Sequence, residues 1–225
     1  MHCADLGVVQ YLVACVLFDV FHEIGGVESR PGDQLSYLLT LIRQAGKTLG
    51  FEKPAINKLT MTMIHAPGQA PKMRTKASEG RKLLASLKHM LEHMVPQNDS
   101  HQQLRYQCVN HMVLIYDELA AWGASSGERV AALGRKALVL YGELQMEDLQ
   151  KTNWQRRGFV LFRLYPKMHQ LQHCLEDQVR SSGNPKEHWC YCDESEIGAG
   201  VKVAESVHPS MIHRGVLQKH RLCDW

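Results

Sequence analysis

The sequence has no apolar run long enough to span a bilayer. Its longest apolar stretch, from Val8 to Phe21, is interrupted by Gln10 and Asp19 and follows no basic segment. A membrane-spanning helix needs about 20 consecutive apolar residues. We therefore interpret this stretch as a buried helix and expect no membrane association.

Paired cysteines and a secretory leader are also missing. The chain has seven cysteines, an odd number, and its first residues carry no recognisable signal peptide. Disulfide-rich secreted domains use cysteines in pairs, whereas reduced thiols are typical of the cytosol and nucleus. We expect a nuclear or cytoplasmic protein, neither secreted nor anchored in a membrane.

Nucleotide-binding and hydrolase motifs are not recognised. The glycines at Gly25-Gly26 and Gly198-Ala199-Gly200 follow no clear strand, so they form no Walker loop, Rossmann fingerprint or nucleophile elbow. The net charge of +3 and the pI near 8.4 are modest for a dedicated nucleic-acid-binding domain. We expect no nucleotide partner, and charge alone does not predict DNA binding.

Helical periodicity is what the sequence has in abundance. Apolar residues recur with the 3.6-residue period of an amphipathic helix in six stretches: residues 6–24, 31 to about 46, 77–94, 100–122, 128–155 and 166–180. Pro31 begins the second stretch, and Asp33 is placed to cap it. The predicted fold class is mainly α, with a helical bundle at its centre.

Prolines, glycines and changes of pattern suggest four segments. Residues 1–50 hold the N-terminal helices, 51–76 a proline-containing connector, 77–155 the helical bundle or insertion, and 156–225 a C-terminal segment. Within the last, Phe159–Tyr165 fits either a short strand or the end of a helix. A final helix is predicted from Pro209 to about Leu222.

Two histidine pairs have the four-residue spacing that places side chains on one face of a helix. His169 and His173 precede Cys190 and Cys192, and together these four residues offer the nitrogen and sulfur ligands that suit zinc. The two cysteines are one residue apart, which makes joint tetrahedral ligation awkward. The alternative is that both histidines are ordinary helix-face residues. His89 and His93, in the second pair, are interpreted as structural.

Three acidic residues follow the cysteines: Asp193, Glu194 and Glu196. Carboxylates at the start of a helix offset the positive end of its dipole, which is one explanation for them. The other is chemical, because Mg²⁺ prefers carboxylate oxygens and two Mg²⁺ ions held by carboxylates catalyse phosphoryl transfer.

Two motifs resemble those of eukaryotic RNase H-like cut-and-paste transposases of the CACTA type and their relatives. The opening Met1-His2-Cys3-Ala4-Asp5-Leu6-Gly7 is similar to the stretch that follows a catalytic aspartate in that family. The block Pro166 to His173, the turn Gly183-Asn184-Pro185 and the segment Trp189 to Glu194 resemble the approach to the family's last catalytic acid.

The resemblance implies a site and its partners. Glu194 would take the place of the last catalytic acid, with Glu196 and Asp193 as the next choices and His169 and His173 nearby. Mg²⁺ would be the cofactor and DNA the partner of the intact ancestral enzyme. The aligned aspartate would fall two positions before Met1, so we expect a truncated, inactive mobile-element protein with one or two strand remnants of an RNase H-like core.

Two other hypotheses remain open. In the first, the chain has kept only a helical bundle as a protein-interaction module, for which exposed apolar surface and self-association would be typical. Alternatively, His169, His173, Cys190 and Cys192 would form a small zinc-binding protein whose folding needs the metal.

Overall fold

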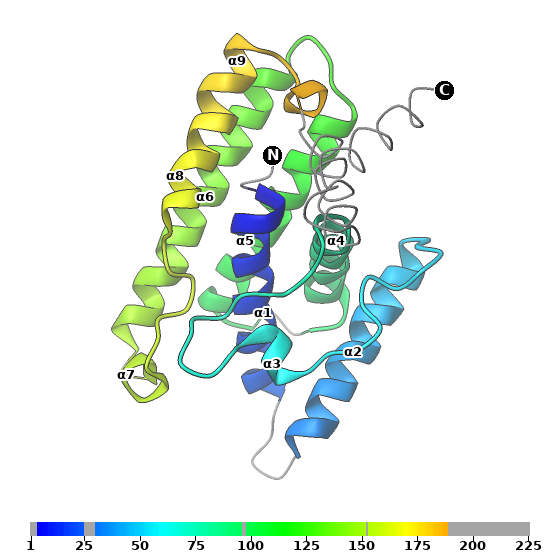
Figure 1. Cartoon of the computed structure of the whole chain (residues 1–225), viewed down its shortest axis with the longest axis vertical. Helices are drawn as coiled ribbons and strands as arrows, with labels where there is room; N and C mark the ends of the chain where they lie inside the picture. The colour runs from blue at the N-terminus through cyan, green and yellow to red at the C-terminus, as the bar shows by residue number, and fades with distance from the viewer. Residues whose placement is uncertain (1–3, 25–29, 96–97, 152, 189–225) are drawn as a thin grey trace, which may run out of the picture. The chain divides into compact units, whose positions relative to one another are not determined.

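The computed structural model describes residues 4–24, 30–95, 98–151 and 153–188, and all regular structure in these ranges is helical (Figure 1). The elements are η1 (Ala4–Val8), α1 (Val9–Ile24), α2 (Pro31–Thr48), α3 (Met61–Ile64), α4 (Ala77–His93), α5 (Ser100–Ala120), α6 (Ser126–Gln150), α7 (Asn153–Arg157), α8 (Pro166–His173), η2 (Cys174–Gln178), α9 (Val179–Ser181) and η3 (Pro185–His188). The predicted mainly α fold class is confirmed.

Helix α1 forms the centre of the core. Its apolar residues lie on all sides, and Leu12, Val16 and Leu17 are fully buried. It contacts η1, α2, α3 and α4, and Figure 1 shows it in dark blue between the other helices. A helix that is apolar all round is stable in water only when neighbours cover every face, so the buried helix predicted here is confirmed.

Helices α5 and α6 form the most extensive helix pair, and the run from α8 to α9 lies along α6 (Figure 1). The α5–α6 connection is short, as its two glycines predicted. Close packing of α6 against η2 depends on Gly134, because a Cβ there would lie 2.8 Å from Leu175 Cδ1. The chain divides into two compact units, Met1–Lys186 and Glu187–Trp225, and all of these helix pairs belong to the first.

Two helix starts use different chemistry. Asp99 caps α5, since its carboxylate accepts from the Gln102 N–H at 2.8 Å while the Gln102 side chain accepts from the Asp99 N–H. Helix α2 begins at Pro31 as predicted, but the predicted cap by Asp33 is wrong. Asp33 lies inside the first turn and makes no capping bond, so its carboxylate acts only through the helix dipole.

The segment Phe159–Tyr165 is not a strand, and no described residue belongs to one. Its backbone instead turns sharply, with Phe162 at a φ of 52°. The Leu161 N–H donates to the Asp148 carboxylate and the Phe162 N–H to Cys15 Sγ, at 2.8 and 3.2 Å. Side chains satisfy these donors, so no partner strand is needed. The strand alternative is therefore wrong, and so is the strand remnant expected there.

Among the described residues, no helix has both the length and the apolar character that a bilayer crossing requires. Helix α1, which the sequence predicts to be a core element, is covered by other helices of the chain.

Candidate functional site

Most of the acidic and cysteine residues singled out by the sequence lie outside the described part of the chain. These are Cys190, Cys192, Asp193, Glu194 and Glu196. The predicted magnesium role of Glu194 and the predicted zinc role of the two cysteines therefore stay predictions.

The other candidate pair, His169 and His173, lies on the exposed face of α8. The Nε2 atoms of the two rings are 3.1 Å apart, which confirms that they share one helix face. His173 Nδ1 is 2.7 Å from the Asp177 carboxylate. Within the described ranges no group of three or more His, Cys, Asp or Glu side chains is placed to hold a metal ion. The pair is thus formed without a third or fourth protein ligand there.

The two ends of the sequence resemblance meet in space. Segment η1, from the opening motif, packs against α8, which carries the Pro166 to His173 block. Contact is closest at Gly7, where a Cβ would lie 2.7 Å from Lys167 Cδ. A larger residue at position 7 would clash with the lysine stem unless that side chain moved. Gly7 and Lys167, 160 positions apart, are therefore in contact, with Gly7 buried and Lys167 half-buried.

Asp5 lies at the centre of this region and is fully buried. The Tyr116 hydroxyl donates to Asp5 Oδ1 at 2.5 Å, and Arg81 Nε is 3.9 Å from the same oxygen. A buried carboxylate needs such partners, because an unpaired charge loses its hydration. Asp5 thereby ties η1 to α4 and α5.

A pair of stacked tyrosines covers the outside of this region. The rings of Tyr11 on α1 and Tyr165 before α8 stack with centroids 4.1 Å apart. Lys72 Nζ lies 5.4 Å from the Tyr11 centroid, and Arg163 Cζ lies 5.7 Å from that of Tyr165. Cations over aromatic faces are attracted by the ring quadrupole. The stack therefore has a cation over the ring of each tyrosine.

The extended segment before α4 adds to the same surface. The Met73 N–H donates to the Gln10 carbonyl at 3.0 Å, and the Gln10 side-chain amide donates to the Thr75 carbonyl at 2.7 Å. Met73 points into the core, whereas the flanking Lys72 and Arg74 are exposed. This alternation is that of an extended chain and presents its cations outward.

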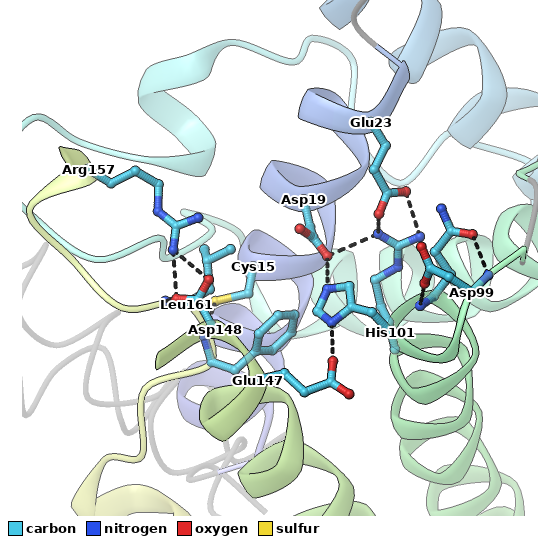
Figure 2. A network of polar contacts seen from close by, with 12 residues as sticks. Cys15, Asp19, Glu23, Asp99, His101, Glu147, Asp148, Arg157 and Leu161 are labelled. Carbon is cyan, nitrogen blue, oxygen red and sulfur yellow. Dashed lines mark hydrogen bonds and ion pairs between the residues drawn. The ribbon is translucent and has the colours of Figure 1, made fainter. Parts of the chain in front are cut away.

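A second polar region, which the sequence did not predict, joins α1 to α5 (Figure 2). Arg105 on α5 is fully buried, and its guanidinium donates two hydrogen bonds to Glu23, at 2.8 and 2.9 Å, and one to Asp19 at 3.1 Å. Bidentate arginine–carboxylate pairs are among the strongest side-chain hydrogen bonds. In the sequence, the feature that indicates this network is the pair of carboxylates Asp19 and Glu23, four residues apart on the otherwise apolar α1.

His101 extends this network to α6 (Figure 2). Its Nε2 is 2.7 Å from Asp19 Oδ2 and its Nδ1 is 2.6 Å from Glu147 Oε2. The hydrogen bond to Asp19 is the main reason why the pKa of His101 is raised, although burial acts in the opposite direction. Burial raises the pKa of Asp19, but His101 and Arg105 together outweigh it and the pKa is lowered. Both nitrogens can donate at once only in the imidazolium.

This arrangement predicts that stability depends on pH. The stabilisation from His101 is fully present below its ordinary pKa of 6.5 and is lost as the pH rises through its higher folded-state pKa. We expect the free energy of unfolding, measured in urea at several pH values, to fall over that range. His101→Gln should flatten the fall, while His111→Gln, on the exposed side of the same helix, should keep it. An unchanged slope in His101→Gln would contradict the assignment.

A cavity of about 450 Å³ lies beside the network, bounded by Asp19, His22, Lys151 and Arg157 among others. Asp148 is 2% exposed on its wall. Arg157 donates to both of its carboxylate oxygens at 2.6 Å, and the Leu161 N–H also donates to it. Each buried carboxylate here already has a cation beside it. These ion pairs therefore link α1, α5, α6 and the segment after α7.

The connection between α5 and α6 reads Gly123-Ala124-Ser125-Ser126-Gly127, which matches the letters of a nucleophile elbow. That motif needs a strand before the serine and a histidine base near it. Here the preceding element is a helix, and the hydroxyl of Ser125, at the nucleophile position, accepts from the Arg129 guanidinium rather than from a histidine. The pattern is therefore a helix–helix turn and not a catalytic serine.

Comparison of the chain with protein-family models, with curated proteins and with solved structures gives no match.

Proposed function

We propose that this chain is a transposase-like protein that contacts DNA through the surface where η1 meets α8. The observation that supports this most is the packing of the opening motif against the Pro166 to His173 block. The resemblance to RNase H-like transposases rests on these two segments together with the turn Gly183-Asn184-Pro185 and the segment Trp189 to Glu194, and a shared site requires the two segments to be adjacent.

The cations at this surface suit the DNA backbone. Lys72 lies over the ring of Tyr11 and Arg163 over that of Tyr165, while the stem of Lys167 on α8 passes close to Gly7 of η1. Lysine and arginine side chains bind phosphates with little regard to base sequence, and they fix the position of a protein on the duplex. The proposed contact is therefore electrostatic and independent of base sequence.

Strand cleavage is not part of the proposed activity of this chain. The resemblance implies Mg²⁺, but the described residues offer no group of ligands for it, and Asp5 of η1 is buried and bound to Tyr116. Glu194 alone would not hold two hard cations.

Fluorescence anisotropy of a labelled DNA duplex tests the proposal. The variant Lys72→Gln/Arg163→Gln/Lys167→Gln removes three cations and keeps most of each side-chain stem. We expect its affinity for DNA to fall by roughly tenfold or more at moderate salt, because each phosphate contact is worth about one released counterion.

A matched control removes the same charge elsewhere. Lys47, Lys53 and Lys58 are exposed on the end of α2 and the connector, and Lys47→Gln/Lys53→Gln/Lys58→Gln should bind DNA nearly as the wild type does. Equal losses in the two triple variants, or no binding by the wild type, would overturn the proposal.

The alternative of a helical interaction module also has a specific observation in its favour. On α6, Val139 and Met146 are 56% and 57% exposed, and the neighbouring Leu164 is 51% exposed. Val139 and Leu164 border a cavity of about 350 Å³. Exposed apolar side chains of this size are typical of protein contacts. A chain that sediments as a dimer and fails to bind DNA would favour this alternative.

A further inference from the structure

The histidine pair on α8 has a geometry that an ordinary pair of surface residues does not require. The Nε2 atoms of His169 and His173 face one another at 3.1 Å, with ring centroids 4.4 Å apart and the planes at 74°. Both side chains are exposed, so no core packing forces the rings together.

This nitrogen–nitrogen distance matches shared ligation of one metal ion. Imidazole nitrogens bind divalent transition metals at about 2.0 to 2.1 Å. Two nitrogens at that distance from one ion are about 2.9 Å apart at a right angle and about 3.4 Å apart at the tetrahedral angle. The observed 3.1 Å lies between these limits. A rotation of the exposed rings that turns both lone pairs from this hydrogen bond towards one ion would therefore need no change of backbone.

Asp177 sets the tautomer of one ligand. Its carboxylate is 2.7 Å from His173 Nδ1 and accepts the proton there, which leaves the Nε2 lone pair directed at His169. Metal-binding histidines usually have such a carboxylate or carbonyl on the other ring nitrogen. His169 Nε2 donates to His173 in the metal-free pair. On metal binding its proton moves to Nδ1, on an exposed ring that water can reach.

We propose that His169 and His173 together bind one divalent transition-metal ion through their Nε2 atoms, with Asp177 orienting His173. Among ions that prefer imidazole, Cu²⁺ should bind most tightly, ahead of Ni²⁺ and Zn²⁺. No third protein ligand lies near in the described ranges, so the remaining coordination positions are open to water or an exchangeable ligand. The site is thus unlike a closed structural zinc site; it lies on the same helix as Lys167, but the proposal does not rest on the proposed DNA contact.

The second histidine pair provides an internal control. His89 and His93 have the same spacing on α4, and their rings are 4.5 Å apart at 57°. His93 Nε2, however, lies 3.7 Å from the Glu92 carboxylate. The spacing of this pair is the same as that of the α8 pair. It differs in the short contact between Nε2 atoms, on which the proposal rests.

Isothermal titration of the full chain with Cu²⁺ tests the site, and circular dichroism verifies the fold of each variant. We expect His169→Ala/His173→Ala to lose the tightest equivalent of Cu²⁺, and His89→Ala/His93→Ala to keep it. Asp177→Asn should weaken the same equivalent by about 10- to 100-fold. Retention of the tight equivalent in His169→Ala/His173→Ala, or its loss in His89→Ala/His93→Ala, would overturn the proposal. An unchanged affinity in Asp177→Asn would remove the role of Asp177.

Discussion

Replacing Arg105 with alanine is expected to lower the free energy of unfolding by about 3 to 5 kcal/mol. The guanidinium is fully buried and is the cation that both Asp19 and Glu23 contact. The substitution leaves two partly buried carboxylates facing each other without that cation, and it opens a cavity between α1 and α5. Loss of one partner from a buried ion pair costs far more than the pair contributes to stability.

Urea denaturation followed by circular dichroism measures this effect. Arg135→Ala is the control, since the Arg135 side chain is 56% exposed and lies 3.7 Å from Glu176. Exposed ion pairs contribute about 0 to 1 kcal/mol, so Arg135→Ala should change stability little. A loss below about 1 kcal/mol in Arg105→Ala would mean that the network does not hold α1 to α5.

The second large effect is expected from Asp148→Ala, at about 3 kcal/mol. This substitution leaves the buried Leu161 N–H without its acceptor and removes the carboxylate to which Arg157 donates two hydrogen bonds. A buried donor without a partner costs about 1 to 3 kcal/mol, and a charged group costs more.

Two comparisons make this prediction specific. Asp148→Asn keeps one acceptor for the Leu161 N–H and should lose clearly less stability than the alanine variant. Glu143→Ala, on the exposed face of the same helix, should lie within about 0.5 kcal/mol of wild type. If Asp148→Ala and Glu143→Ala were equally stable, Asp148 would not fix the turn after α7.

The helices could be predicted from sequence because their signals are local. The apolar pattern of α1, the proline at the start of α2 and the glycines between α5 and α6 each act within one or two turns. The sharp turn at Phe159–Tyr165 could not be predicted, because its backbone donors are bonded to the side chains of Asp148, 13 residues before Leu161, and of Cys15, 147 residues before Phe162. Its short apolar pattern alone resembles a strand.

The same distinction between local signals and long-range contacts applies to the candidate sites. The spacing of His169 and His173 was enough to place them on one face, but their contact with Asp177 required the continuation of the helix through η2. The ion pair of Asp19 and Arg105 joins residues 86 positions apart, so only the packing of α1 against α5 could reveal it. The stack of Tyr11 on Tyr165 is longer-range still. Glu194 stays a prediction from resemblance.

The salt dependence of DNA affinity tests whether DNA phosphates bind where η1 meets α8. Each phosphate contact adds about 0.9 to the slope of log affinity against log salt concentration. We expect Lys72→Gln/Arg163→Gln/Lys167→Gln to lower this slope by about 2 to 3, and the control variant at Lys47, Lys53 and Lys58 to keep the wild-type slope. The same slope in all three proteins would show that these cations do not contact the phosphates.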